Sequence, residues 1–409
     1  MRRIGEKAFE QPLFSFFKEQ RPMKVRNSYI LHLISYVFVL TLLSCGNSTK
    51  QRAYVSADSL FQRHDSLFAL ADQYSDTIVI KYAKGLKVEY LEDGIHVQIT
   101  NPDPSVTQSV PEELVITGPS SRFICTTALQ LGNFEVLGLE ERIVGMNSLK
   151  NIFDGKIRQQ MDEGKTVKIG KEGNFDLETV IAIRPDYIFV SASKHGGFEA
   201  LRESGIPIIS HHGYKETNPL GQAEWIKLIG LLTGETRRAN AVFADIETKY
   251  LKLKDEVHGM IGTKAKPTVA SGRQIRDGWY IVGGQSYLAQ IFEDAGADYV
   301  MADNEESGGG TLDFEEAFAK SVNADFWQID GAYDGDYTLA TLENEDPRYA
   351  HMNAFKRQQV LFCNLSQTPY RELSPVEPHI LLADFVKAFH PELLPHYTPK
   401  YYKELKNLP

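Results

Sequence analysis

One long amphipathic pattern separates the two halves of this chain. From residue 235 to residue 258, apolar side chains recur every three or four positions, which is the spacing of one face of an α-helix. These positions are Ala239, Val242, Phe243, Ile246, Tyr250, Leu253 and Val257. At 1.5 Å per residue, a helix of roughly 24 residues spans about 36 Å, which is close to the width of a small domain. Such a helix can brace two lobes; the alternative is a plain surface helix.

On both sides of this helix, short apolar runs alternate with helical segments, as is typical of parallel α/β sheets. Before it, we expect strands at 114–117, 143–146, 187–192 and 207–210 and helices at 125–131, 176–184 and 197–204. After it, we expect strands at 268–270, 279–282, 325–329 and 360–362 and helices at 287–295, 313–322 and 378–389. The sequence therefore predicts an α/β fold with two Rossmann-like lobes, 113–234 and 263–409, bridged by a long helix within 235–262.

A short pattern occurs once in each half. The first copy has Asp176-Leu177-Glu178, then Ala182, then a strand that begins near Asp186. The second copy has Asp313-Phe314-Glu315, then Ala319, then a strand that begins near Asp325. Two copies of one α/β unit flanking one helix predict a clamshell with a groove between its halves.

The region before the first lobe carries a hairpin signal. Residues 87–90 and 96–99 are strand-like and flank a turn that contains Asp93-Gly94, a common hairpin turn. Residues 46–58 are polar and without pattern, as in a flexible tether. We therefore expect residues 46–112 to hold a tether and a small β extension.

The first 45 residues have the order of a secretory leader. Lys24 and Arg26 precede an apolar run at 30–43, which is shorter than a membrane-spanning helix, and Ser44-Cys45-Gly46 follow it. Leu42-Leu43-Ser44-Cys45 resembles a bacterial lipobox, so Cys45 is expected to be acylated and to become the first mature residue. An ordinary signal peptide is the alternative. Met23 is the natural start of such a leader, and residues 1–22 are then an upstream extension.

Charge and cysteine content exclude several functions. Residues 1–44 hold 7 of the 44 Lys and Arg residues and 3 of the 54 Asp and Glu residues, which leaves a mature net charge of −14. This charge disfavours nucleic acid as a partner. The remaining Cys125 and Cys363 fall in different lobes, so the sequence offers no disulfide framework and no thiolate metal site.

Motifs for catalysis are incomplete. Gly308-Gly309-Gly310 lacks the Lys and Ser or Thr of a phosphate-binding loop. The segment around Ser286 begins like a nucleophile elbow, but Leu288 replaces the second glycine. We expect Ser286 to cap a helix, no cofactor and no enzymatic activity; a secreted hydrolase centred on Ser286 is the alternative.

Several histidines could in principle form a metal site. His211-His212 are adjacent, and His195, His351 and His379 could complete a site across the groove. A zinc or manganese receptor is therefore a second alternative, although H-E-x-x-H and C-x-x-C motifs are absent from the sequence and a His pair at a strand end is commonly a loop feature.

The order of lipobox, lobe, long helix and lobe resembles the class III periplasmic binding proteins, which capture cobalamin, siderophores or haem for ABC importers. The resemblance covers residues 113–400. Residues 174–178 followed by 184–189 are similar to that family's first-lobe motif. Residues 218–227 and 389–395 look like the iron-complex-binding branch of Bacteroidetes-type bacteria.

The resemblance implies a periplasmic, lipid-anchored protein that delivers a ferric siderophore to a permease and its ATPase subunits, with cobalamin or haem as alternatives. It also implies that Glu178 and Glu315 grip arginine pockets on the permease, with Glu316 as a contender for the second position. Arginine binds carboxylate through two charge-assisted hydrogen bonds. The alternative is that these acids only complement the helix dipole.

Loops at the carboxyl ends of strands are where open α/β sheets bind ligands. The candidates in such loops are Ser120, Arg122, Lys194, His195, Tyr214, Trp279, Tyr280, Tyr333, Tyr370 and Arg371. Aromatic and cationic groups together suit a large, partly anionic chelate. Haem would favour an axial Tyr214, His211 or Tyr370. The long helix predicts a largely preformed cleft with modest closure.

Overall fold

The computed structural model describes residue 60 and residues 65–106, 110–148, 152–171, 173–191, 198–262 and 264–407. Residues 54–409 form one compact unit. The predicted leader with Cys45 and the candidates Lys194 and His195 lie outside the described residues. No helix within the described ranges has the length and apolar character needed to cross a membrane.

The first lobe is built on a parallel five-stranded sheet with the order β10-β9-β4-β5-β6. Its strands are β4 (Phe123–Cys125), β5 (Ile143–Met146), β6 (Val167–Lys168), β9 (Tyr187–Val190) and β10 (Ile208–Ser210). Its helices are α4 (Ala128–Glu135), α5 (Gly155–Asp162), α6 (Leu177–Ala182) and α7 (Glu199–Glu203), and β7 (Gly170–Lys171) pairs with β8 (Asn174–Phe175). The central strands are buried throughout, as expected for a sheet covered on both faces.

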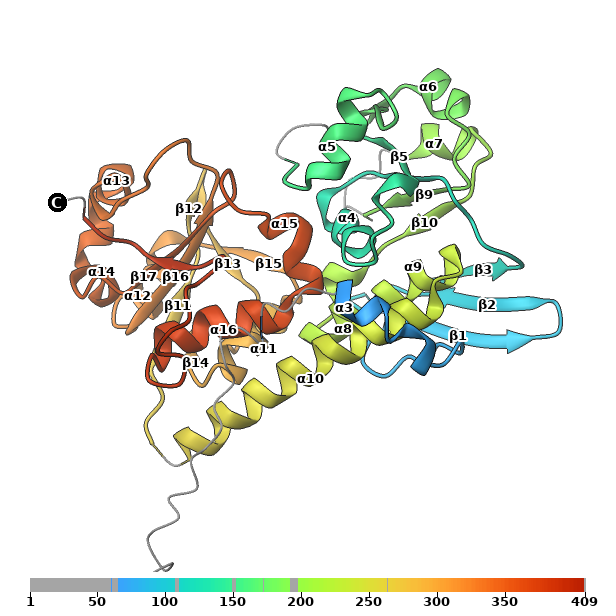
Figure 1. Ribbon diagram of the computed structural model, residues 1–409. Helices are drawn as coiled ribbons and strands as arrows, with labels where there is room; N and C mark the ends of the chain where they lie inside the picture. Colours follow the sequence, from blue (N-terminus) through green and yellow to red (C-terminus); the bar gives the residue numbers. More distant parts are fainter. Residues whose placement is uncertain are drawn as a thin grey trace, which may run out of the picture. The chain divides into compact units, whose positions relative to one another are not determined.

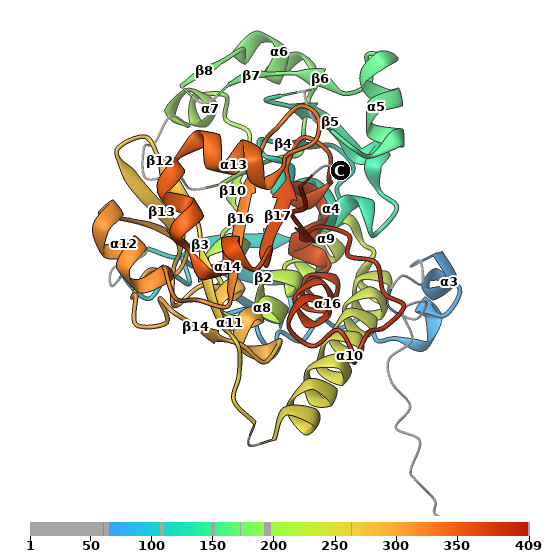
Figure 2. The same ribbon diagram turned by 90° about the vertical axis from the view of Figure 1, so that its left-hand side faces the viewer.

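The second lobe holds a sheet with the order β14-β11-β16-β17-β18, parallel except for the last strand. These strands are β11 (Thr268–Ser271), β14 (Asp298–Tyr299), β16 (Phe326–Gly331), β17 (Val360–Asn364) and β18 (Lys403–Glu404). A separate antiparallel sheet consists of β12 (Arg273–Ile275), β13 (Gly278–Val282) and β15 (Gly309–Leu312). The helices are α11 (Tyr287–Asp294), α12 (Phe314–Ser321), α13 (Leu339–Glu345), α14 (Asn353–Lys356), α15 (Tyr370–Leu373) and α16 (Pro378–Phe389). Figures 1 and 2 show α12 and α16 on opposite sides of the parallel sheet.

The two parallel sheets share one topology. In chain order, β4, β5, β9 and β10 occupy the same relative places as β11, β14, β16 and β17. The acids before the corresponding strands also act alike: Asp186 accepts the amides of Ser121 and Arg122, and Asp325 accepts the amide of Thr268. The two copies of the predicted repeat therefore occupy equivalent elements, and in each copy an aspartate accepts amides next to the neighbouring strand.

The predicted long helix is α10 (Thr236–Ile261), and all its predicted apolar positions are buried. It packs against α8 (Pro219–Glu224) and α9 (Ile226–Thr233), and further along against α11 and α16. Figure 1 shows it in yellow, passing these helices in turn. The prediction of an α/β fold with two lobes and one bridging helix is confirmed.

The β extension is an antiparallel sheet of β1 (Leu86–Leu91), β2 (Gly94–Ile99) and β3 (Glu112–Ile116), preceded by the short α3 (Asp65–Phe68). The predicted hairpin is present, with Gly94 at φ 146°. The strand expected at 114–117 was wrongly placed in the first lobe, since β3 pairs with β2 and its residues Glu113 and Val115 face outward. The first parallel strand is instead β4, which ends at Cys125 where a helix was expected to begin. The predicted boundary at residue 113 falls inside β3.

Residues 79–85, which we call the strap, are held by two buried carboxylates. Glu224 accepts the amides of Lys81, Tyr82 and Ala83, and Glu216 accepts those of Lys84 and Gly85. Both side chains are fully buried. The Asn218–Lys227 segment, whose sequence suggested the iron-complex branch, therefore forms part of the socket that fixes the N-terminal extension.

Candidate functional site

A cavity of about 510 Å³ lies between the carboxyl ends of strands from the two lobes. Its first-lobe wall follows β4 and β5 and consists of Thr126, Thr127, Ala128, Leu129, Met146, Asn147, Ser148, Ile152 and Phe153. Its second-lobe wall follows β17 and consists of Leu365, Thr368, Arg371 and Glu372. This is the edge at which open α/β sheets bind ligands. We call this space the inter-lobe cavity.

A smaller cavity of about 280 Å³ shares Thr126, Thr127, Leu129 and Asn147 with the inter-lobe cavity. It adds Ser191 after β9, together with Phe198 and Tyr214. Burial raises the pKa of the Tyr214 phenol above its ordinary value. The predicted candidate Tyr214 therefore lies at this edge of the first lobe.

Asp330 at the end of β16 belongs to the second lobe's carboxyl edge and was missed by sequence reasoning. Its side chain is accessible, yet desolvation raises its pKa, while the positive charges of Arg273 and Arg371 oppose the shift. The Asp330 charge in turn helps to raise the pKa of Tyr280, whose side chain is 46% exposed. The signal available in the sequence was its position directly after the expected strand 325–329.

Three predicted second-lobe candidates also follow the ends of parallel strands. Tyr333 comes after β16, is partly exposed and meets Tyr337 edge-on. Tyr370 begins α15 after β17 and packs edge-on against Tyr401 and Tyr402. Arg371 follows directly and is exposed to the inter-lobe cavity.

The prediction of Trp279 as a ligand-contacting residue is contradicted by its burial. Its side chain is 0% exposed, its Nε1 donates to the carbonyl of Ser271 at 3.0 Å, and its ring packs against Trp327. Successive side chains of a strand point to opposite faces, so Trp279 enters the core while Tyr280 faces outward.

Ser120 and Arg122 do not reach the carboxyl edge either. They precede β4 and so lie at its amino end, because the strand expected before them belongs to the extension. The Arg122 guanidinium donates to the carbonyls of Ile183 and Arg184, and the Ser120 carbonyl accepts from Arg142. The structural reason for treating them as ligand residues is therefore absent.

A carboxylate joins the lobes beside the inter-lobe cavity. Glu372, which is 1% exposed, accepts the amides of Phe153 at 2.8 Å and Asp154 at 3.3 Å. Burial, together with the Glu372 charge, raises the pKa of Glu135 on α4 to about 9. A Cβ on Gly132 would lie 2.0 Å from the Glu372 carbonyl oxygen, so α4 and α15 approach closely. Glu135 therefore keeps its proton at neutral pH, and burial also raises the pKa of Glu372, against the effect of the Phe153 and Asp154 amides.

The histidine candidates within the described residues lie in different elements. His211 and His212 are buried against Trp225, and desolvation lowers the pKa of His211 to about 3. His379 is buried in α16, whereas His351 is exposed. Within the part of the chain that the structure describes, no group of three or more His, Cys, Asp or Glu side chains could hold a metal ion. Cys125 and Cys363 are buried free thiols in β4 and β17.

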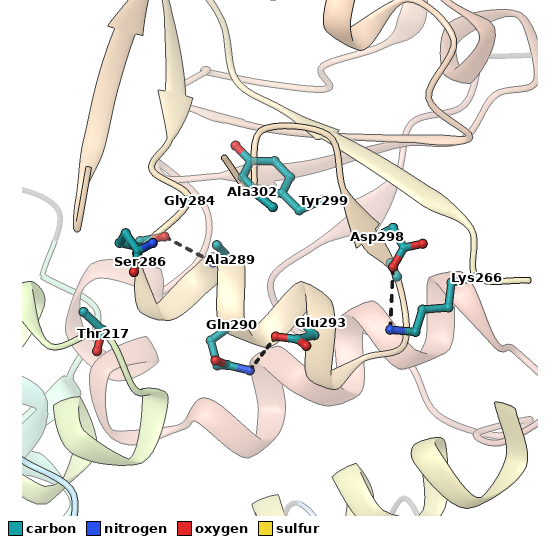
Figure 3. Close-up of a pocket in the computed structure, with 12 residues that line it drawn as sticks. Thr217, Lys266, Gly284, Ser286, Ala289, Gln290, Glu293, Asp298, Tyr299 and Ala302 are labelled. Carbon is teal, nitrogen blue, oxygen red and sulfur yellow. Dashed lines mark hydrogen bonds and ion pairs between the residues drawn. The ribbon is translucent and has the colours of Figure 1, made fainter. Parts of the chain in front are cut away.

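A third cavity, of about 380 Å³, lies along α11 (Figure 3). Its polar side chains pair with one another: Gln290 donates to Glu293 at 3.1 Å, and Lys266 lies 3.6 Å from Asp298. Ser286 accepts the amide of Ala289 and donates to the carbonyl of Gly283. Ser286 is thus the predicted helix cap, and its hydroxyl proton is already engaged.

The two acids considered for docking occupy equivalent places. Glu178 lies in the first turn of α6 and Glu315 in the first turn of α12, next to Glu316. All three are exposed, and an aspartate, Asp176 or Asp313, stands at the N-cap of each helix.

Comparisons with known proteins agree with this geometry. Residues 124–364 match the family described as periplasmic binding protein. An uncharacterized lipoprotein of Methanocaldococcus jannaschii is 25% identical over 354 residues, covering 77% of this chain and 83% of the relative.

Two solved structures show the same fold. A protein of an ABC-type Fe3+-hydroxamate transport system of Saccharomonospora viridis is 18% identical with a TM-score of 0.53, covering 71% of this chain and 99% of the other. A periplasmic heme binding protein of Pseudomonas aeruginosa is 18% identical with a TM-score of 0.53, covering 71% and 100%. The family match spans more than half of the sequence, and its members bind substrates without catalysing a reaction. This chain therefore belongs to the periplasmic binding protein family and is not an enzyme.

Proposed function

We propose that this protein is the lipid-anchored substrate-binding subunit of an ABC importer and that it captures a ferric siderophore in the inter-lobe cavity. The observation that carries the proposal is that residues from the carboxyl ends of both parallel sheets line one cavity. A ligand held there touches both lobes at once, so its binding is coupled to the relative position of the lobes.

The walls suit an iron complex of mixed character. Tyr214 and Phe198 offer aromatic surface in the smaller cavity, Arg371 offers positive charge in the inter-lobe cavity, and Thr126, Thr127 and Asn147 offer neutral polar groups in both. Aromatic faces and a few placed polar groups are the usual lining of small-molecule sites. Lys194 and His195 remain candidates for the same site.

Haem is the second candidate. Tyr214 lines the smaller cavity beside the inter-lobe cavity, and a tyrosine can serve as an axial ligand to haem iron. The P. aeruginosa protein of the same fold is named as a heme binding protein. Cobalamin, which would need fewer charges in the cleft, is the third.

Binding of chromophoric ligands tests the proposal. Purified protein is titrated separately with a ferric hydroxamate siderophore, hemin and cyanocobalamin, and absorbance and heat are recorded. A saturable one-to-one change with the siderophore supports the proposal. Saturation only with hemin or cyanocobalamin reassigns the ligand, and the absence of binding by all three contradicts capture of a metal complex.

The anchor and location are part of the same proposal. The lipobox at Cys45 supports acylation and attachment at the periplasmic face of a membrane. Replacing Cys45 with Ser should release the protein from the membrane fraction, which immunoblotting of fractionated cells measures. Membrane retention of Cys45→Ser would contradict the anchor.

A further inference from the structure

The start of α4 borders the inter-lobe cavity, and a buried hydroxyl without a hydrogen-bond partner lies directly before it. Thr126, directly before the N-cap residue Thr127, is 2% exposed and lines both the inter-lobe cavity and its smaller neighbour. Its Oγ1 is buried and has no hydrogen-bond partner among the described residues. Leaving a buried hydroxyl without a partner is unfavourable, so its position beside a cavity indicates a partner that a ligand supplies.

The same turn supplies backbone donors. The amides of Ala128 and Leu129 open α4, where the first turn of a helix has no intrahelical acceptors. Ala128, Leu129 and Thr126 line the same cavity. The aligned peptide dipoles also make this end of the helix positive. The free amide donors and the positive end of the helix dipole both favour binding of a negatively charged oxygen group.

A cation from the other lobe lines the same cavity as this turn. Arg371 lines the inter-lobe cavity from the second lobe, and its guanidinium makes no side-chain hydrogen bond within the described ranges, although its charge acts on Asp330. A guanidinium matches carboxylate or phosphate through two parallel hydrogen bonds. An anionic group between α4 and Arg371 would therefore be bound by both lobes.

Three acids lie near this place, and the charge of Arg371 already acts on one of them, Asp330, whose pKa is raised by burial. The Glu372 carboxylate is turned toward the amides of Phe153 and Asp154, which stabilise its charge. Glu135, on the same helix, keeps its proton at neutral pH because burial raises its pKa to about 9.

We propose that Thr126, the first turn of α4 and Arg371 form an oxyanion subsite, and that the transported ligand carries a free carboxylate or phosphate group which this subsite binds. The inference rests on the proposed function, because it assigns one end of the ligand captured in the inter-lobe cavity.

Calorimetric titration with sodium citrate and with orthophosphate, at constant ionic strength and without iron, tests the subsite directly. The wild-type protein should bind at least one of these anions, and Thr126→Val and Arg371→Gln should each weaken that binding tenfold or more. Comparing the two anions distinguishes a carboxylate from a phosphate preference. Arg357→Gln, which removes an exposed arginine paired with Asp325, is the matched control and should bind as the wild type does. Thermal melting of each variant verifies folding.

A second pair of probes separates this inference from the proposed function. N-acetyl-ferrioxamine B and N-succinyl-ferrioxamine B are the same ferric hydroxamate without and with a terminal carboxylate. The succinyl form should bind at least tenfold more tightly, and Arg371→Gln should remove the difference. Equal binding of both forms by wild type and variant overturns the subsite but leaves iron-complex capture standing. Anion binding that depends on Thr126 and Arg371, with neither complex bound, supports the subsite and contradicts the hydroxamate ligand. If neither anions nor complexes bind, both proposals fail.

Discussion

At the level of single residues, buried carboxylates join segments that are far apart in the sequence. Glu216 and Glu224 accept the amides of the strap, and Glu372 accepts amides from the opposite lobe. Burying a carboxylate is costly unless several donors satisfy it, and backbone amides do so here. These roles could not be predicted, because a glutamate is normally interpreted as a surface residue.

Glu135 should make stability depend on pH. Its pKa rises from an ordinary 4.5 to about 9 on folding, so between these values the folded state holds a proton that the unfolded state has lost. The free energy of unfolding should therefore fall as pH increases from about 5 to 9. Glu135→Gln should flatten this slope, as measured by urea denaturation at pH 5, 7 and 9. The exposed Glu141→Gln is the control, and an unchanged slope in Glu135→Gln would contradict the assignment.

Glu224 should be essential for holding the strap. Its carboxylate accepts three strap amides and lies 2.6 Å from Lys227 Nζ, and both side chains are buried. Glu224→Gln leaves a buried lysine without its counter-charge, so a loss of about 3–5 kcal/mol is expected in urea denaturation. Adding Lys227→Met should recover part of this loss. Additive effects of the two substitutions would exclude the coupling.

The candidate site was predictable where strand ends were correctly located. The predicted candidates Tyr214 and Arg371 do line cavities at the carboxyl edges. They could be predicted because the strands before them lie nearly where the sequence placed them. The prediction of Ser120 and Arg122 as ligand-contacting residues lost its basis because a strand of the extension was mistaken for a strand of the lobe. The prediction of Trp279 was wrong because which side chains of a strand face the core depends on its register.

At the level of elements, strong periodicity predicted the longer helices well, whereas three-residue strands were ambiguous. α10 extends three residues past its predicted end, to Ile261 before Gly262, whose φ is 53°. β4 contains only Phe123, Ile124 and Cys125, and such a short apolar run does not distinguish a strand from the start of a helix.

Ser286 should contribute to stability as the N-cap of α11, and not to catalysis. Ser286→Ala removes the acceptor for the Ala289 amide and should cost about 1 kcal/mol in the free energy of unfolding. Thermal denaturation measures this loss. Hydrolysis of p-nitrophenyl acetate should be at the same background rate for wild type and variant; a rate that falls with Ser286→Ala would instead revive the hydrolase alternative.

Gly132 should control the approach of α4 to α15. A Cβ at this position would lie 2.0 Å from the Glu372 carbonyl, so Gly132→Ala should force the helices apart and cost about 1–3 kcal/mol. It should also weaken ligand binding, because both helices border the inter-lobe cavity. Gly155→Ala on α5 meets no atom within 4 Å and is the control. Equal stability of the two variants would show that the contact is not tight.

At the level of the whole molecule, the sequence predicted the two lobes and the bridging helix but not the function of the extension. Periodic patterns report which face of an element is buried. The contact of the strap with Glu216 and Glu224 joins residues more than 130 positions apart and leaves no local pattern. This contact could therefore not be predicted from the sequence.

Glu178 and Glu315 should act only in transport. Replacing both with Lys should leave ligand affinity unchanged, because both are exposed in the first turns of α6 and α12, and should abolish uptake by cells that depend on this protein. Radioactive iron uptake and calorimetry measure the two effects. Asp162→Lys with Glu343→Lys reverses the same number of charges on α5 and α13 and is the control. Full uptake by the Glu178 and Glu315 double variant would show that these acids only complement the helix dipole and do not dock to the permease.

The socket for the strap also imposes an order on biosynthesis. The strap is synthesised 131 to 143 residues before the acids that accept its amides. At about 5–20 residues per second, a ribosome needs on the order of 10 s to cover that interval. The strap therefore cannot form these hydrogen bonds until both acids have been synthesised, so its docking completes the first lobe and cannot begin it.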